Sequence, residues 1–317
     1  MSFQEWLPLA VLFSSLLPGL LIFTLPEEWV RLRTSLNLFG ALTKLVLVFV
    51  LLAGVQAGES FGVRFEVVPG LELAFKADAL GLLFITLSTI LWLFTTMYAI
   101  GYLEGAPHRS RFFGFFSLCV TATMGIAMAA NLFTFFIFYE LLTLSTFPLI
   151  VHRGNDKAMK GGTVYLTYTL IGGTALLTGI VWLHHLLGQT EFTHAGIASA
   201  LGPEYAGQLK LIFLLLIAGV GVKAAIVPLH GWLPQAMVAP APVSALLHAV
   251  AVVKAGAFGI IRIVYEIYGV EFAQSLNLLL PLTIFAAFTI LWGSMRALFQ
   301  DDLKKRLAFS TVSQVSY

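Results

Sequence analysis

Five charged residues of this chain lie inside long apolar stretches. One is acidic and four are basic: Glu140, Lys44, Lys223, Lys254 and Arg262. A charged side chain at the middle of a lipid bilayer costs at least about 2.5–3.5 kcal/mol, so such residues usually face protein or water and mark ion pathways. These residue types therefore predict a path for protons or other ions through a membrane.

Glu140 lies near the middle of the segment NLFTFFIFYELLTLSTFPLI. Phe136, Thr143 and Phe147 share its face of a helix. A carboxylate in such surroundings stays ionised only beside a cation or in a water-filled groove. We expect Glu140 to take part in proton transfer. The alternative is an ion pair that only fixes helix packing.

Lys223 lies in LLIAGVGVKAAIVPLHGWLP, where Pro228 and Pro234 should interrupt regular helix bonding. Interrupted helices in membranes often form ion sites. Burial favours the neutral form of a lysine and a nearby carboxylate favours the charged form, so a movement of Glu140 would load or release a proton on Lys223. We expect a water-mediated contact between the two; the alternative is that Lys223 reaches the membrane surface. His230 is a further candidate for the path, although the break could turn it away.

His248 and Lys254 lie in VSALLHAVAVVKAGAFGIIR. Six residues of regular helix rotate by about 240°, so the two side chains should face different neighbours. We expect Lys254 to carry protons, and His248 either to join it or to form a helix–helix hydrogen bond. Arg262, nearer the outer end, is interpreted as an interfacial anchor. Lys44 is a further candidate for the path, the alternatives being extension to the membrane surface and contact with a partner subunit.

The elements that position these residues are membrane-spanning helices. Of the 317 residues, 59% are hydrophobic and 11% are charged, whereas a typical soluble domain carries about 25% charge. Crossing the hydrocarbon takes about 20 mostly apolar residues. Stretches of that length lie at 6–25, 34–55, 79–103, 113–131, 132–151, 163–187, 209–230, 241–265 and 273–295, and a tenth begins near 306. Because an incomplete span leaves backbone groups unsatisfied in lipid, we expect either a truncated chain, which we favour, or a partner that covers this end.

Lysine and arginine predict the orientation. With the N-terminus outside, the inner connections hold Arg31, Arg33, Arg109, Arg111, Arg153, Lys157, Lys160, Arg296, Lys304, Lys305 and Arg306, and the outer ones hold Arg64, Lys76 and Lys210. This bias predicts an outer N-terminus. No basic residues precede the first stretch, so it is expected to be a retained span rather than a signal peptide.

The outer segment 56–78 alternates apolar and polar residues around Pro69 and Gly70, which predicts a short β-hairpin. We expect a multi-pass protein of the cell inner (plasma) membrane.

Motifs for other chemistry are missing from the sequence. There is no CxxC, HExxH or carboxylate cluster for a metal, and no P-loop or GxGxxG fingerprint for a nucleotide. The lone cysteine, Cys119, excludes an internal disulfide and is expected to pack in the core. A net charge of +2 gives no support for nucleic-acid binding. We expect no cofactor in this chain.

Three segments together resemble one family. The segment VKAAIVPLHGWLPQAMVAPAPVSALLHAVAVVKAGAFGIIR resembles the signature of the antiporter-like subunits of respiratory complex I, membrane-bound hydrogenases and Mrp-type sodium/proton antiporters. The segment FYELLTLSTFPLIVH is similar to their fifth-span motif, and DDLKKRLAFSTVSQVSY to the start of their tenth helix. The resemblance runs from about residue 78 to the end of the sequence.

The resemblance implies an all-α membrane fold of fourteen helices, built from two inverted five-helix repeats that each contain one broken helix. It divides this chain into residues 1–112, with three helices and the hairpin; 113–268, the first repeat with its broken seventh helix; and 269–317, the start of a second repeat. Glu140, Lys223, His248 and Lys254 match the family's fifth-helix glutamate, broken-helix lysine, eighth-helix histidine and central-axis lysine. The second repeat's distal ionisable residue lies beyond the sequence.

The resemblance implies proton, or cation/proton, translocation within a multisubunit complex. The partners would be other membrane subunits and the lipid bilayer, with protons as the transported ion and sodium as a second candidate. The sequence leaves the complex I, hydrogenase, Mrp and carbon-uptake branches open, and so also whether the chain is a non-catalytic subunit of an NADH-quinone oxidoreductase. The alternatives are a self-contained transporter of another ion or small solute, including inorganic carbon, and a scaffold whose charges only hold subunits together.

Overall fold

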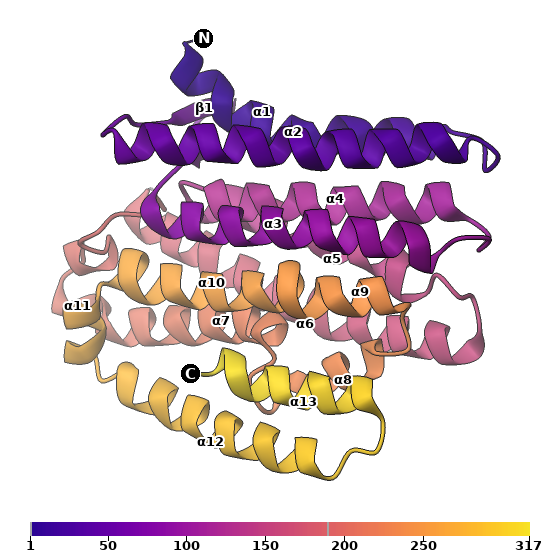
Figure 1. Cartoon of the computed structure of the whole chain (residues 1–317). Coiled ribbons are helices and arrows are strands. Elements are labelled where there is room, and N and C mark those ends of the chain that lie inside the picture. Colours follow the sequence, from indigo (N-terminus) through magenta and orange to yellow (C-terminus); the bar gives the residue numbers. More distant parts are fainter. Residues whose placement is uncertain (1, 189) are drawn as a thin grey trace.

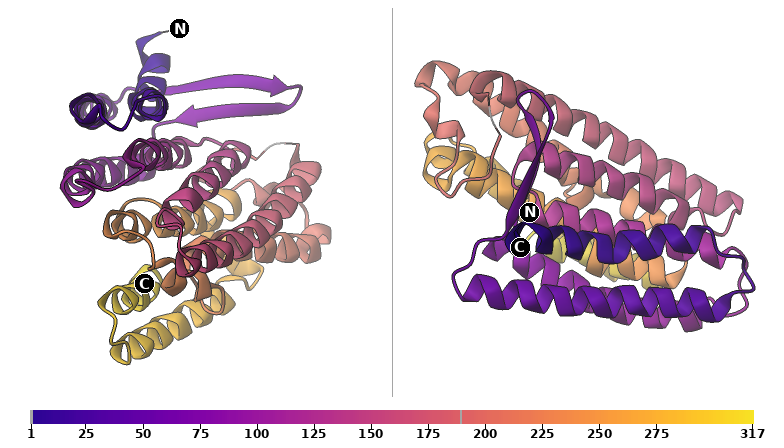
Figure 2. Two further views of the ribbon diagram at one scale, coloured as in Figure 1. Left: turned by 90° about the vertical axis from the view of Figure 1, so that its right-hand side faces the viewer. Right: turned by 90° about the horizontal axis from the view of Figure 1, so that it is seen from above.

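The structure, a computed structural model, describes residues 2–188 and 190–317. Long helices run side by side, and a small antiparallel sheet lies at the end of the bundle where α1 begins (Figure 1, Figure 2). The elements are α1 (Phe3–Phe23), α2 (Val30–Gln56), β1 (Gly62–Val68), β2 (Leu71–Lys76), α3 (Ala79–Tyr102), α4 (Arg109–Met128), α5 (Leu132–Ile150), α6 (Asp156–Leu187), η1 (Ala198–Ala200), η2 (Pro203–Tyr205), α7 (Ala206–Ala224), η3 (Leu229–Gly231), α8 (Trp232–Ala236), α9 (Ala241–Ala245), η4 (Leu246–Val250), α10 (Val252–Arg262), η5 (Ile263–Tyr268), α11 (Val270–Ser275), α12 (Leu279–Leu298) and α13 (Leu303–Val315).

Nine helices of the described chain are long and apolar enough to cross a membrane. Two of them are composite: Pro203–Ala236 joins η2, α7, η3 and α8, and Ala241–Tyr268 joins α9, η4, α10 and η5. The thirteen residues of α13 fall short of the roughly 20 that a crossing needs. The predicted all-α, multi-pass membrane fold with a broken seventh span is therefore confirmed.

Helix α4 lies at the centre of the bundle and α12 at its edge. In the most apolar stretch of each helix, 83% of the α4 residues are buried inside the protein, against 11% for α12. Helix α4 packs against α1, α5 and α10. Its approach to α1 is close because Gly19 has no side chain: a Cβ there would lie 2.8 Å from the Cβ of Ser117. The central helix therefore fixes the positions of the helices around it.

The predicted hairpin is present as the antiparallel pair β1 and β2. Its turn contains Gly70, whose φ of +82° is readily adopted by glycine. The hairpin is also joined to the helices, since the Ala130 amide donates to the Ala74 carbonyl over 2.8 Å. The side-chain amide of Asn131 donates to the Glu72 carbonyl over 3.0 Å. The turn between α4 and α5 thus extends the sheet.

The connection between α6 and α7 is tied to the same place. The Leu132 amide donates to the Thr190 carbonyl, and the Phe192 amide donates to the Ala130 carbonyl, each over 2.9 Å. Arg64 of β1 forms an ion pair with Glu191. The hairpin, the α4–α5 turn and the α6–α7 connection therefore form one hydrogen-bonded unit at this end of the bundle.

At the opposite end, the connection between α1 and α2 caps α4. His108, the residue before α4, has a left-handed backbone and its side chain caps nothing. Instead the Glu27 carboxylate accepts hydrogen bonds from the amides of Arg109 and Ser110, each over 3.0 Å. The Arg33 guanidinium lies 3.7 Å from the same carboxylate. Burial acts to raise the pKa of Glu27, but these hydrogen bonds and charges lower it overall.

The two ends of the bundle therefore differ in composition. The N-terminus and the hairpin lie at one end, and the α1–α2, α3–α4 and α5–α6 connections lie at the other (Figure 1). Of the basic residues that predicted an inner side, Arg153 lies in one of these connections, and six lie in the first turns of the helices that follow them: Arg31, Arg33, Arg109, Arg111, Lys157 and Lys160. The assignment of the N-terminus to the outside stays a prediction.

Replacing Glu27 with glutamine should destabilise the protein by about 1 kcal/mol at pH 7, because the cap of α4 loses its charge. A carboxyl group whose pKa is lowered on folding stabilises the folded state above its unfolded pKa and loses this effect as the pH falls. The difference between Glu27→Gln and the parent should thus shrink as the pH falls below the ordinary value of 4.5. Thermal unfolding between pH 3 and pH 8 measures it, and a constant difference would contradict the role of the charge.

Candidate functional site

The seventh span is interrupted directly after Lys223. Helix α7 ends at Ala224, and Ala225 has a left-handed backbone with φ of +58°. Regular α-helix resumes at Trp232, so of the two prolines expected to interrupt the helix only Pro228 lies within the break. Pro234 falls in the first turn of α8, where a proline is tolerated because the first amides of a helix have no partner within it. Pro228 is the proline that belongs to the break.

The freed backbone groups of the break find partners elsewhere in the protein. The Val227 amide donates to the Thr289 hydroxyl of α12 over 3.1 Å. The indole N–H of Trp232 donates to the Val222 carbonyl over 2.6 Å. Unpaired backbone groups at membrane depth are costly, so these bonds make the break tolerable.

Lys223 is completely buried at the end of α7 and points toward α5. Its Nζ donates to the backbone carbonyl of Tyr139 and lies 3.4 Å from the centroid of the Tyr139 ring. The Tyr139 hydroxyl donates back to the Gly219 carbonyl of α7 over 3.0 Å. Lys223 therefore does not extend to the membrane surface, and Tyr139 locks α5 to α7 beside it.

Glu140 follows Tyr139 and is half-buried. It lies close enough to Lys223 for the two charges to interact, but they form no ion pair within 4.0 Å in the described chain. Its Oε1 atom is buried and has no hydrogen-bond partner. The carboxyl group packs against Gly173 of α6, where a Cβ would lie 2.9 Å from the Glu140 Cδ. The expected water-mediated contact between Glu140 and Lys223 stays a prediction.

Hydroxyl and thiol groups surround the pair. The Cys119 thiol lies 3.4 Å from the hydroxyls of both Ser145 and Thr146. The Tyr165 hydroxyl donates to the Thr143 carbonyl over 3.5 Å. Cys119 is buried, as expected, but it is also near enough to Lys223 for an electrostatic interaction. The sequence interpretation missed these groups and Tyr139 because uncharged residues in a span carry no sign of which ones face the site.

His230 does not face the same side as Lys223. It lies in η3, within the break, and its ring centroid is 6.1 Å from that of Phe309 on α13. It also interacts electrostatically with Arg296 at the end of α12. The break turns His230 toward α12 and α13, whereas Lys223 faces α5.

His248 and Lys254 lie on either side of an irregular point in the eighth span. Residues 246–250 form a π-helical turn, and Ala251 departs from helical geometry with φ of −130° and ψ of −75°. Such turns often occur at functional sites. His248 Nε2 lies 3.0 Å from the Met237 sulfur, and its Nδ1 has no partner. Lys254 is half-buried and forms no hydrogen bond or ion pair with any described residue.

Arg262 is a buried ion-pair centre, so its interpretation as an interfacial anchor was wrong. Its Nη1 lies 2.6 Å from an Asp78 oxygen and 2.5 Å from a Glu266 oxygen. Asp78 also caps α3 by accepting from the Gly81 amide over 2.7 Å. Arg262 therefore joins the end of α10 to the start of α3. Its two partners come from loops and helix ends, which a search for charges inside spans does not find.

Lys44 is also completely buried within this chain. Its side chain therefore neither extends to the membrane surface nor contacts a partner subunit, which were the two alternatives to a place on the path. Its Nζ donates to the Ser15 hydroxyl over 2.5 Å, and the Ser15 and Thr121 hydroxyls are 2.8 Å apart. The indole of Trp92 lies 5.0 Å from Nζ. These groups come from α1, α2, α3 and α4.

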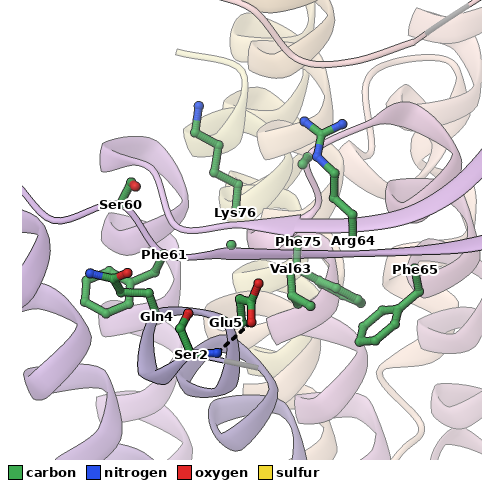
Figure 3. A pocket seen from close by; sticks show the side chains of 12 residues that line it. Ser2, Gln4, Glu5, Ser60, Phe61, Val63, Arg64, Phe65, Phe75 and Lys76 are labelled. Atoms are coloured by element: carbon green, nitrogen blue, oxygen red, sulfur yellow. Dashed lines mark hydrogen bonds between the residues drawn. The ribbon is translucent and has the colours of Figure 1, made fainter.

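Five cavities of the described chain are lined by none of Glu140, Lys223, His248 and Lys254. Figure 3 shows one at the hairpin, lined by side chains of β1 and β2 and by Ser2, Gln4 and Glu5 at the start of α1, and its volume is about 700 Å³. A second cavity of about 400 Å³ lies beside the break, and Lys210 is the one charged residue among the described residues that line it. Within residues 2–188 and 190–317, no three His, Cys, Asp or Glu side chains cluster as metal ligands would.

Comparison with known proteins identifies the family. The family model described as "NADH:quinone oxidoreductase/Mrp antiporter, TM" matches residues 129–317, more than half of the chain. The chain belongs to this family. A second model, for the N-terminus of chain 5 of NADH-ubiquinone oxidoreductase (complex I), matches residues 69–113. The resemblance that the sequence motifs predicted is therefore confirmed.

Curated members of the family include antiporter subunits. The chain is 35% identical over 247 residues to the A1 subunit of a Na(+)/H(+) antiporter of Staphylococcus haemolyticus, covering 78% of this chain and 30% of that protein. It is 32% identical over 290 residues to the A/B subunit of a probable K(+)/H(+) antiporter of Rhizobium meliloti, covering 89% of this chain and 28% of that protein. The chain thus spans under a third of the length of these relatives.

Solved structures share the fold. An Mrp complex from Dietzia contains a chain with a TM-score of 0.81 and 25% identity, covering 98% of this chain and 33% of that one. An archaeal membrane-bound sulfane sulfur reductase contains a chain with a TM-score of 0.83 at 22% identity, covering 99% of this chain and 62% of that one; it supports the fold alone.

Replacing Gly173 with alanine should displace the Glu140 carboxylate, because the new methyl group would lie 2.9 Å from the Glu140 Cδ. We expect the variant to lose about 1–3 kcal/mol of folding stability, because overpacking of a well-packed interior forces neighbouring groups to shift, and thermal unfolding of the purified protein measures the loss. Gly207→Ala, at the start of α7 where nothing lies within 4 Å, is the matched control. Equal unfolding temperatures of the two variants would show that the Glu140 carboxylate can move away from Gly173 at no cost.

Proposed function

We propose that this chain translocates protons, or exchanges a cation for protons, as an antiporter-like subunit of a multisubunit ion-pumping complex in the plasma membrane. The observation that carries the proposal is the buried Lys223 at the break of the seventh span, beside Glu140 and without a direct ion pair. A fully paired lysine would be a structural link. An amine held by one carbonyl beside a separate carboxylate can change its protonation when that carboxylate moves.

Glu140 acts in this scheme as the group that controls Lys223. A negative charge near the amine favours its protonated form, and loss or withdrawal of that charge favours release of the proton. The unpartnered Oε1 of Glu140 leaves the carboxylate without a fixed hydrogen bond on that oxygen. Small shifts of α5 against α6 and α7 would therefore alter the Glu140–Lys223 interaction.

From Lys223 the proton would pass along a hydrated line to His248 and then to Lys254. The π-helical turn that contains His248, and Ala251 directly after it, leave irregular backbone at membrane depth, which favours polar contacts or water there. His248 has an unpartnered Nδ1, and Lys254 has no fixed partner in the described chain. Groups without fixed partners can exchange protons with waters that bridge them. His230 and Lys44 stay outside this proposed route.

The relatives' names favour an Mrp-type cation/proton antiporter subunit over the complex I, hydrogenase and carbon-uptake branches. Sodium and potassium appear in those names, so either cation is a candidate exchange partner for protons. The partners of the chain would be the other membrane subunits of such an assembly. A self-contained carrier of a polar solute is less consistent with the cavity beside the break, because that cavity is lined almost wholly by apolar side chains.

Replacing Glu140 with glutamine should abolish coupled proton movement, or lower it by roughly tenfold or more, while the complex still assembles. The amide keeps the shape of the side chain but removes the charge that holds a proton on Lys223. Fluorescence quenching of a pH-sensitive dye in inverted vesicles measures the flux, and blue native electrophoresis measures assembly. If assembly fails while the surviving complexes pump normally, Glu140 has a structural role instead.

Replacing Lys254 with methionine should stop proton transfer and spare the fold, since methionine keeps much of the length and loses the charge. Replacing it with arginine should also stop transfer, because a guanidinium does not release its proton at ordinary pH. The same vesicle assay compares the two variants with the parent. Normal pumping by Lys254→Arg would mean that Lys254 supplies only a fixed positive charge, and the proposed relay would be wrong.

A further inference from the structure

Another polar cavity lies at the end of the bundle opposite the hairpin. Its volume is about 650 Å³, and it opens between the α3–α4 connection, the α5–α6 connection and the segment before α9. Its lining residues with ionisable side chains other than tyrosine are His108, Arg111, His152 and Arg153. Among the described residues, no aspartate or glutamate lines it. The cavity therefore gathers positive and potentially positive groups with no carboxylate among them.

The two arginines of the cavity lack the pairing of other arginines at the same end. Arg33 and Arg109 each lie 3.7 Å from the Glu27 carboxylate, which holds them in the cap of α4. Arg111 and Arg153 form no ion pair with any described carboxylate. Arg111 makes only a long contact of 3.5 Å from its Nη2 to the His152 carbonyl. Both guanidinium groups thus keep most of their donors free for an anion.

His152 adds a neutral donor or acceptor to the cavity. Its pKa is lowered to about 4 by burial and then by the charges of Arg111, His108 and Arg153, with Glu27 acting the other way. Its buried Nδ1 has no hydrogen-bond partner. The ring is held edge-on by Phe112, 5.2 Å between centroids. A fixed imidazole with an unsatisfied ring nitrogen, beside unpaired arginines, is suited to an oxygen-rich anion.

The cavity lies at the depth of lipid headgroups. The α3 span ends at Tyr102, the α5 span ends at Ile150 and the α6 span begins at Asp156, so the cavity marks the boundary of the hydrocarbon. Its remaining walls are Tyr102, Leu103, Ala106, Pro107, Gly154 and Pro240. Basic pockets between membrane helices, with apolar walls toward the bilayer, fit the headgroup of an anionic lipid.

We propose that this cavity binds the phosphate group of an anionic phospholipid from the adjacent leaflet. Arg111 and Arg153 donate to the phosphate oxygens, and the His152 ring nitrogen donates a third hydrogen bond. The glycerol part of the lipid lies against Leu103 and Pro107, so that its chains extend into the bilayer. Binding of this kind joins the start of α4 to the α5–α6 connection, which are also joined by the Arg111–His152 hydrogen bond and the Phe112–His152 ring contact.

The test uses the complete complex, purified in detergent and stripped of lipid, with native mass spectrometry as the readout. The probes are dioctanoyl-phosphatidylglycerol, dioctanoyl-phosphatidylcholine and inorganic phosphate. We expect phosphatidylglycerol to bind, and Arg111→Gln and Arg153→Gln each to weaken its binding by about tenfold. Arg31→Gln is the matched control, because Arg31 is an exposed arginine at the same end that does not line the cavity. This variant should leave binding unchanged.

Three results would overturn the proposal. Equal binding of phosphatidylglycerol by the parent and Arg111→Gln would show that the lipid does not bind in this cavity. Equal weakening by Arg31→Gln would reduce the effect to the general charge of this face. Displacement of the lipid by millimolar inorganic phosphate would assign the site to free phosphate rather than to a phospholipid. None of these outcomes depends on transport, so failure here leaves the proposed proton relay untouched.

Discussion

The need to satisfy every polar group that leaves water governs this structure. Lys223 meets that need with a single carbonyl and an aromatic face, both supplied by Tyr139. Tyr139 in turn satisfies the Gly219 carbonyl of α7, so the same residue that holds the amine also holds its helix. The break after Lys223 is stabilised by Thr289 and Trp232, which pair with backbone groups at the break, and by turn hydrogen bonds within the break itself.

Three buried basic residues meet the same constraint in three ways. Arg262 is neutralised by two carboxylates and acts as a rigid link between α3 and α10. Lys44 has a hydroxyl chain through Ser15 to Thr121 and no described carboxylate within ion-pair distance. Lys223 has a carboxylate near it but not bound to it. Only this last arrangement lets a small displacement change the charge of the amine, which is why the proposed function rests on Lys223.

The sequence predicted most of the fold because membrane helices are set by length and hydropathy. The nine spans, the hairpin around Gly70 and the break near Pro228 all follow from local composition and from the missing amide of proline. Other features depend on partners distant in the chain. The burial of Arg262 needed Asp78 and Glu266, the cap of α4 needed Glu27, and the direction of His230 depended on the backbone path through the break. The π-helical turn at 246–250 has no proline or glycine that would predict it.

The candidate site was predicted in its charged members and missed in its neutral ones, because charge is rare in apolar sequence whereas Tyr139, Gly173 and Cys119 are ordinary residues of a membrane helix. The order of proton movement through His248 and Lys254 stays a prediction.

The hydrogen-bonded unit at the hairpin has a mechanical consequence. It fastens the end of α4 and the start of α5 to the connection that follows α6, through Ala130, Leu132 and Arg64. A change of backbone angle at Ala225 would therefore displace α8, which follows the break, more than the anchored ends of α4 and α5. Any movement at the break would thus be greatest at the end of the bundle opposite the hairpin.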